Sequence, residues 1–115
     1  MKYLLLIHQN EAAQDSAGKE ASARRMSAYA AYTEAMIKAG AYVGGQRLRP
    51  STAASTVRVR EGKTEVLDGP YAETKEQLGG YYVIDVPDLD GALSWAARCP
   101  GAQYGTIEVR PIWDM

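Results

Sequence analysis

The feature that most constrains the fold is a short apolar run near the beginning of the sequence. Residues 3–7 are Tyr-Leu-Leu-Leu-Ile, with no polar interruption. Side chains on a strand alternate between its two faces, so a strand of this composition needs cover on both faces. The run is too short for the core of a signal peptide and for a membrane span. We therefore expect a buried strand over residues 2–8, in a cytoplasmic protein without a membrane partner.

Length and charge narrow the class of protein. The chain has 115 residues, of which 46% are hydrophobic, and its formal net charge is −1. This length is typical of one domain, which we place at residues 1–115. A near-neutral charge gives no electrostatic reason to expect nucleic acid as a partner. Cys99 is the single cysteine, so an intramolecular disulfide is excluded and a reducing compartment is expected.

Apolar spacing predicts a helix over residues 22–39 and a second helix that closes at Pro100. Residues three and four positions apart share one face of a helix. In the first helix this face holds Met26, Tyr29, Ala30, Thr33, Met36 and Ile37. In the second it holds Leu89, Ala92, Leu93 and Ala96. Gly40 is placed to end the first helix, and Asp88 to cap the start of the second.

The remaining regular segments are predicted as strands. They cover residues 42–48, 56–61, 64–67, 81–86 and 106–112. A turn at residues 61–63 joins two of them into a hairpin, and Gly44-Gly45 indicates a bulge or a close backbone approach. Residues 10–21 are expected to be a loop or a frayed helix start, and residues 73–78 one helical turn. The order β-α-β, hairpin, β-α-β predicts an α+β protein with a ferredoxin-like sheet and both helices on one face.

The two faces of this sheet differ in polarity. In the last strand Ile107 and Val109 alternate with polar residues, so we expect this pair to face the helices. The other face then carries Arg110, near Arg58 and Arg60, together with apolar groups of the first strand. We expect a second copy of the chain to dock on this mixed face, which predicts a homodimer with a polar pocket between the copies. The alternative is a solvated sheet face.

Two titratable residues are candidates for catalysis. His8 is the single histidine and can act as a general acid or base near neutral pH. Asp68 begins an Asp-Gly-Pro turn. Its carboxylate either points into a cleft shared with His8 or only caps the turn by bonding to the backbone of the turn. Arg47, Arg58 and Arg110 are candidates for holding a carboxylate or phosphate, or are ion-pair partners on strands.

The sequence predicts neither a metal nor a cofactor. One histidine and one cysteine are too few for a zinc site. Residues 85–91 resemble the start of a calcium loop, but the glycine falls too early and the final Glu is missing. There is also no phosphate loop or dinucleotide fingerprint.

One segment resembles a known family. Residues 68–82, with the sequence DGPYAETKEQLGGYY, are similar to the signature of the DGPF proteins, a branch of the YCII-related family. Residues 1–7, 44–48 and 105–112 also resemble that family, and Tyr71 stands where the motif has phenylalanine. The resemblance implies a ferredoxin-like fold that dimerises through its sheets into a dimeric α/β barrel. It also favours a ligand-binding role for Glu73 and Lys75.

The function stays open between classes. In one interpretation the protein is an enzyme in which His8 and Asp68 transfer protons on a small polar or anionic substrate held by an arginine. The alternative is a non-catalytic ligand-binding or regulatory module. The resemblance is compatible with both interpretations, because some YCII-related proteins look like small-molecule enzymes, whereas DGPF proteins are often encoded beside extracytoplasmic-function sigma factors, which implies a functional link to one. The third interpretation is a structural dimer without a ligand.

Overall fold

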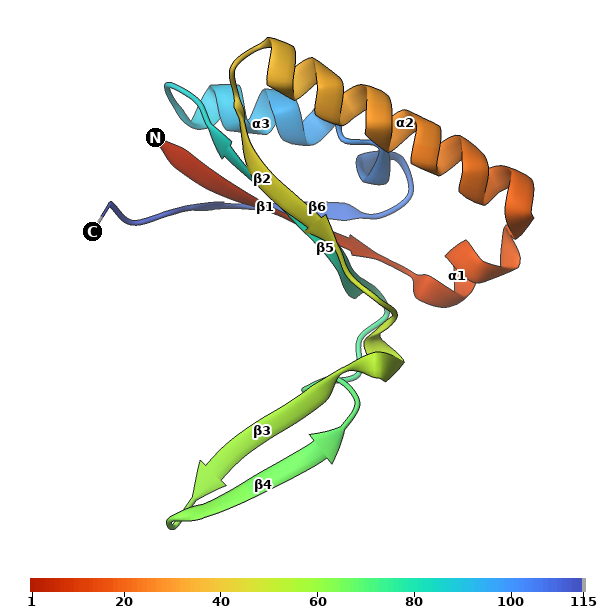
Figure 1. The fold of residues 1–115 in the computed structure, drawn as a ribbon, viewed down its shortest axis with the longest axis vertical. Coiled ribbons are helices and arrows are strands. Elements are labelled where there is room, and N and C mark those ends of the chain that lie inside the picture. Colours follow the sequence, from red (N-terminus) through yellow and green to blue (C-terminus); the bar gives the residue numbers. More distant parts are fainter. Residues whose placement is uncertain (115) are drawn as a thin grey trace.

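A computed structural model describes residues 1–114 and shows one antiparallel sheet with helices on one face and a separate hairpin (Figure 1). The elements are β1 (Lys2–Gln9), α1 (Glu11–Ser16), α2 (Gly18–Lys38), β2 (Tyr42–Arg47), the 3₁₀ turn η1 (Ser51–Ala53), β3 (Ser55–Arg60), β4 (Lys63–Asp68), β5 (Gln77–Asp85), α3 (Leu89–Arg98), the 3₁₀ turn η2 (Pro100–Gln103) and β6 (Thr106–Pro111). The main sheet has the order β2-β5-β1-β6. The predicted α+β class is confirmed, and this order is compatible with a ferredoxin-like fold.

The core lies between the main sheet and its two long helices. Tyr3, Leu5 and Ile7 of the central strand β1 are buried beneath α2 and α3. The alternate residues Leu4 and Leu6 point to the other face, where they are half-buried in this chain. One face of β1 is therefore covered as predicted, while the cover expected on the second face does not come from the same chain. No helix in the described residues 1–114 is long and apolar enough to cross a membrane.

Local capping explains where the helices begin and end. The Asn10 side chain accepts a hydrogen bond from the backbone N–H of Ala13 at 2.9 Å, so the segment predicted as a loop or frayed start is mostly helical. Helix α2 ends before Gly40, which has a positive φ of 75°, as predicted for a glycine stop. Asp88 caps α3 by accepting from the N–H of Gly91 at 2.8 Å, also as predicted.

The hairpin does not belong to the main sheet. Strands β3 and β4 pair only with each other and project away from the helices, beyond the ends of β2 and β5 (Figure 1). The expectation that Arg58 and Arg60 lie beside Arg110 on one sheet face is therefore wrong within a single chain. Alternation along β3 shows that it is a strand, but alternation carries no information about which strands it pairs with.

The connection from the hairpin to β5 also differs from the expectation. Residues 73–78 do not form a helical turn; they run in an irregular path until β5 begins at Gln77. The Gln77 side chain holds this path by accepting from the N–H of Glu11 at 3.0 Å and donating to the carbonyl of Thr74 at 2.6 Å. A side chain that bridges distant segments in this way overrides a weak local helix preference.

Candidate functional site

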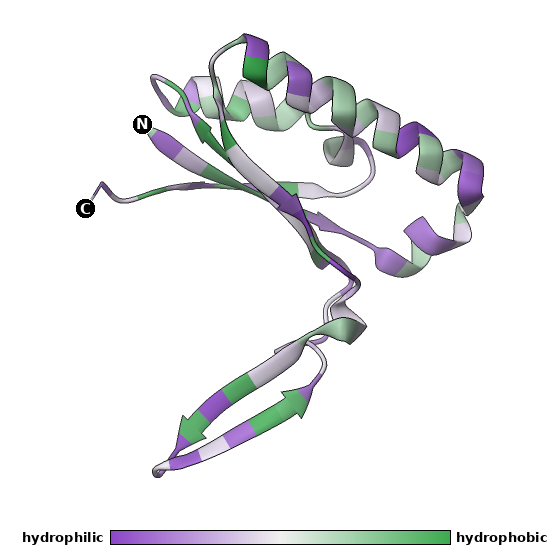
Figure 2. Ribbon diagram, in the orientation of Figure 1, coloured by the Kyte–Doolittle hydropathy of each residue, from purple (hydrophilic) through white to green (hydrophobic). Residues whose placement is uncertain are grey.

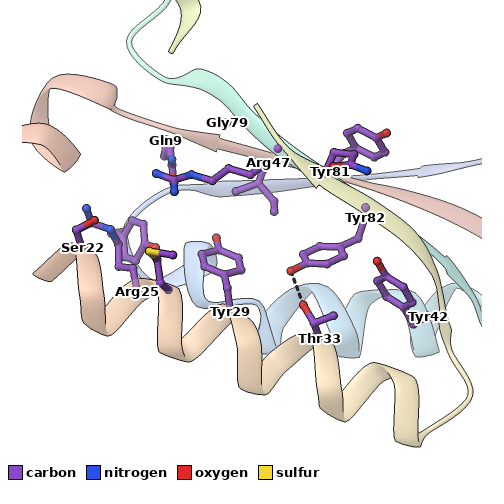
Figure 3. A pocket seen from close by; sticks show the side chains of 16 residues that line it. Gln9, Ser22, Arg25, Tyr29, Thr33, Tyr42, Arg47, Gly79, Tyr81 and Tyr82 are labelled. Carbon is purple, nitrogen blue, oxygen red and sulfur yellow. Dashed lines mark hydrogen bonds between the residues drawn. The ribbon is translucent and has the colours of Figure 1, made fainter. Parts of the chain in front are cut away.

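A cavity of about 330 Å³ lies between α2 and the β2–β5 half of the sheet (Figure 3). One wall is the sheet-facing stripe of α2, from Ser22 to Thr33. The other wall is formed by β2 and β5, with Gln9 at the end of β1. This volume is at the small end of the range for pockets that bind small molecules. We call it the α2 cavity.

Glycines allow the sheet wall to approach its neighbours closely. A Cβ atom on Gly45 would lie 2.7 Å from both the Tyr81 carbonyl oxygen and the Tyr82 ring. A Cβ atom on Gly79 would lie 2.8 Å from the side-chain nitrogen of Gln9. The predicted irregularity at Gly44-Gly45 is confirmed, because the pairing of β2 with β5 shifts register between Tyr42 and Gly44.

Tyrosine side chains line the middle of the α2 cavity. The Tyr82 hydroxyl lies 2.9 Å from the Thr33 hydroxyl across the space between sheet and helix (Figure 3). Burial raises the pKa of Tyr82, and burial followed by the neighbouring Cys99 and Tyr104 raises the pKa of Tyr29. These phenols therefore stay protonated at physiological pH. They present neutral rings with hydroxyl groups that can donate or accept a hydrogen bond.

Two arginines mark the polar end of the cavity. Arg25 comes from α2 and Arg47 from the end of β2. Both also border a second hollow of about 330 Å³ on the outer side, so they stand where the two spaces meet. The Arg25 guanidinium donates to the Gln14 carbonyl at 3.2 Å, which anchors it.

No carboxylate of residues 1–114 balances the two arginines inside the α2 cavity itself. No aspartate or glutamate of residues 1–114 lines the α2 cavity, and neither Arg25 nor Arg47 is ion-paired within that range. The second hollow is lined by Glu11 and Asp15 as well as by Lys19, and the Glu11 carboxylate accepts from the N–H and the hydroxyl of Ser51 at 2.7 and 2.8 Å. The arrangement can therefore bind an anionic group.

The structure places the predicted site residues in three locations. Arg47 lines the α2 cavity. His8 and Arg110 lie on the face of the sheet opposite the helices, on either side of Glu108. The His8 Nε2 atom is 3.4 Å from one carboxylate oxygen of Glu108, and the Arg110 Nε atom is 3.6 Å from the other. The buried Nε2 atom of His8 has no aligned hydrogen-bond partner in the described part of the chain.

The other predicted residues belong to the hairpin and the segment after it. Asp68 ends β4 opposite Ser55, and Arg58 stands opposite Glu65. Glu73 and Lys75 are exposed in the connection to β5. None of the four predicted residues lines the α2 cavity. His8 and Asp68 lie in different sheets, and their shared cleft stays a prediction.

Sequence reasoning missed most of the cavity. It assigned Tyr29 and Thr33 to the apolar face of the helix and did not single out Arg25. A usable signal was present, since Arg25, Tyr29 and Thr33 recur every four residues on the stripe that faces the sheet. A core-facing stripe with this many polar atoms indicates a hollow that needs hydrogen-bonding groups. Among the residues described, no group of three or more His, Cys, Asp or Glu is placed to hold a metal ion.

Comparison with known proteins supports the resemblance seen in the sequence. The YCII-related domain matches residues 1–115. The chain is 41% identical over 114 residues to the uncharacterized protein R00369 of Rhizobium meliloti (strain 1021), an alignment that covers 97% of this chain and 92% of that protein. A match over the whole chain and a relative of this identity leave one assignment: the protein belongs to the YCII-related family.

Proposed function

We propose that this protein binds a small molecule with an anionic group on an aromatic or apolar body, in the α2 cavity. The observation that carries the proposal is the pair Arg25 and Arg47 at one end of a tyrosine-lined space that no carboxylate of residues 1–114 enters. Guanidinium groups present planar paired donors that match a carboxylate or phosphate. The rings of Tyr29 and Tyr82 offer apolar area to the rest of the ligand.

Calorimetry with small probes tests this proposal. Benzoate and phenyl phosphate should bind, while neutral benzyl alcohol should bind much more weakly. Arg47→Gln keeps a polar side chain but removes the charge, and it should weaken benzoate binding about tenfold or more, as expected for loss of a charged hydrogen bond. Arg58→Gln, on the hairpin, is the matched control and should change nothing. Equal binding of all three probes, or an unaffected Arg47→Gln variant, would contradict the proposal.

The acid–base role of His8 and Asp68 is a second candidate. The half-buried His8 imidazole favours it, because its Nε2 atom lies 3.4 Å from the Glu108 carboxylate but makes no aligned hydrogen bond within residues 1–114, so this atom is not committed to a protein partner. Any probe that binds can be followed by NMR for conversion to product. Turnover that His8→Gln and Asp68→Asn both abolish would support an enzyme. Binding without turnover would favour the alternative, a non-catalytic ligand-binding or regulatory module.

Two finer assignments belong to the same proposal. Residues 68–82 support placing the chain in the DGPF branch of its family. The open face of the main sheet supports pairing of two copies into a dimeric α/β barrel. We call this the helix-free face; its apolar part is Leu4 and Leu6 of β1 with Tyr81 and Val83 of β5. These side chains are half-buried in one chain, and a second sheet would cover them.

A further inference from the structure

We propose that the hairpin is an arm that packs against a second copy of this chain. The arm is defined as β3 and β4, residues 55–68. The proposal rests on the pairing of two chains through their sheets and adds a second contact region to it. It assigns a role to a part of the structure that the described residues leave largely uncovered.

The chain exposes more surface than a compact monomer of its size. The chain exposes 8160 Å², whereas a compact monomer of 12.5 kDa exposes about 6,200 Å². Its radius of gyration is 16.0 Å, against about 13 Å for a compact domain of this length. The excess of about 2,000 Å² exceeds the roughly 800 Å² per chain that a standard interface buries. The projecting arm is the visible source of this shape (Figure 1).

The side chains of the arm separate into an apolar face and a charged face. Val57 stands opposite Val66 in the strand register, so the two share one face, and Val59 lies two residues further along it. Their exposed fractions are 60%, 62% and 57%. Figure 2 shows hydrophobic residues on both strands of the arm. The other face carries the cross-strand pair Arg58 and Glu65. The arm is thus amphipathic, and residues 1–114 leave its apolar face largely uncovered.

An arm of two strands gains little stability by itself. An isolated two-stranded hairpin is at best marginally stable in water, because it has no third strand or helix to bury its apolar face. The arm nevertheless has a favourable turn, with Glu61 and Gly62 at φ of 51° and 74°, as a two-residue hairpin turn requires. A hairpin with three exposed valines on one face would therefore be stabilised by a surface that covers this face.

A second copy is the occupant that meets these conditions. Every copy carries both an arm and a helix-free face, so a twofold pair covers each of these surfaces in both chains at once. The excess surface is large enough for such a contact without any other protein. We therefore expect the valine face of each arm to be buried in the homodimer.

Sedimentation velocity over a range of concentrations tests the arm. The triple variant Val57→Thr, Val59→Thr, Val66→Thr keeps β-branched residues, so the hairpin is retained while its apolar face is lost. The dimer dissociation constant should rise about 100-fold or more. Leu67→Thr is the matched control, since it removes an exposed apolar residue from the opposite face of the same strand, and it should leave the constant unchanged.

Hydrogen exchange on the unmodified protein gives a second measurement. Amides of β3 and β4 should be protected at concentrations where the dimer forms and should exchange rapidly in diluted monomer. The role of the arm would be overturned if the triple variant and Leu67→Thr had the same dimer dissociation constant and the arm amides were unprotected. Pairing of the two sheets would then still stand. A wild-type protein that stays monomeric at submillimolar concentration would overturn both.

Discussion

Arg25 and Arg47 reach the α2 cavity from elements far apart in the sequence. Whether their charges can bind a ligand depends on the groups that surround them. An arginine on a surface is usually paired or solvated and contributes little to stability. Here both guanidinium groups border a hollow lined by tyrosine rings, and among residues 1–114 no carboxylate enters it. The residues at the other end, Tyr82 and Thr33, supply neutral hydroxyl groups. The cavity thus separates a cationic end from an uncharged one.

The approach of Tyr82 to β2 depends on a glycine. Gly45→Ala should lower the free energy of unfolding by about 1–3 kcal/mol, the usual cost of overpacking, since the new methyl group would meet backbone as well as ring atoms 2.7 Å away. Gly44→Ala is the control, because nothing lies within 4 Å of its Cβ position. Urea denaturation of both variants measures the difference. Equal stabilities would show that the sheet relaxes around Gly45.

Alkaline pH should destabilise the fold through buried phenols. Burial raises the pKa of Tyr29 and Tyr82 above the ordinary value of 10.0, and the unfolded chain loses those protons first. The free energy of unfolding is therefore unaffected below about pH 10 and falls as the pH rises above it. Denaturant titrations at a series of alkaline pH values should show this fall. In the double variant Tyr29→Phe, Tyr82→Phe the free energy of unfolding should fall less steeply with pH. An identical slope would contradict the role of these two phenols.

At the scale of elements, short-range caps determine where α3 begins. Asp88 accepts from the N–H of Gly91 at 2.8 Å, which satisfies one donor of the first helical turn. Asp88→Ala should cost about 1 kcal/mol of stability, as is typical for loss of an N-cap. Asp88→Asn retains the accepting oxygen and should restore most of this loss. Thermal unfolding of both variants measures these changes. If Asp88→Asn destabilises the protein as much as Asp88→Ala, the charge of Asp88 and not its capping hydrogen bond stabilises the helix.

The strands show a different dependence. Ile107 and Val109 face the core and alternate with exposed residues, as their pattern predicts. The arm has the same kind of alternation, yet its valines are exposed and its strands form their own sheet. One strand pattern thus leads to two environments, because alternation describes a strand's faces and not its neighbours.

At the scale of the whole molecule, the surface area and the radius of gyration both exceed those of a compact domain of this length. We expect light scattering to report twice 12.5 kDa. Thermal unfolding should then depend on concentration, with the midpoint rising as the protein is concentrated, because association stabilises the folded state by mass action. A midpoint that does not move, together with a mass of 12.5 kDa, would contradict dimerisation.

Short-range sequence patterns were enough to predict the helix caps, the hairpin turn and the family. The caps at Asp88 and Gly40 and the turn at residue 62 act between near neighbours, so the chain alone settles them. The predicted apolar face of α2 is only partly correct, because Met26 and Ile37 are exposed and Tyr32 is buried instead. The motif at residues 68–82 is likewise a continuous stretch, and it led to the family that the whole chain matches. These features do not depend on which distant segments meet.

The strand partners and the cavity depend instead on contacts between distant segments. Arg58 and Arg110 carry the same pattern on their strands, but the arm's separate sheet keeps them apart within one chain. Arg25 becomes a cavity residue only because α2 crosses β2 and β5 at a distance that leaves space beside it. Pairing and packing between distant segments depend on the summed contacts of the whole chain, and no local pattern encodes that sum.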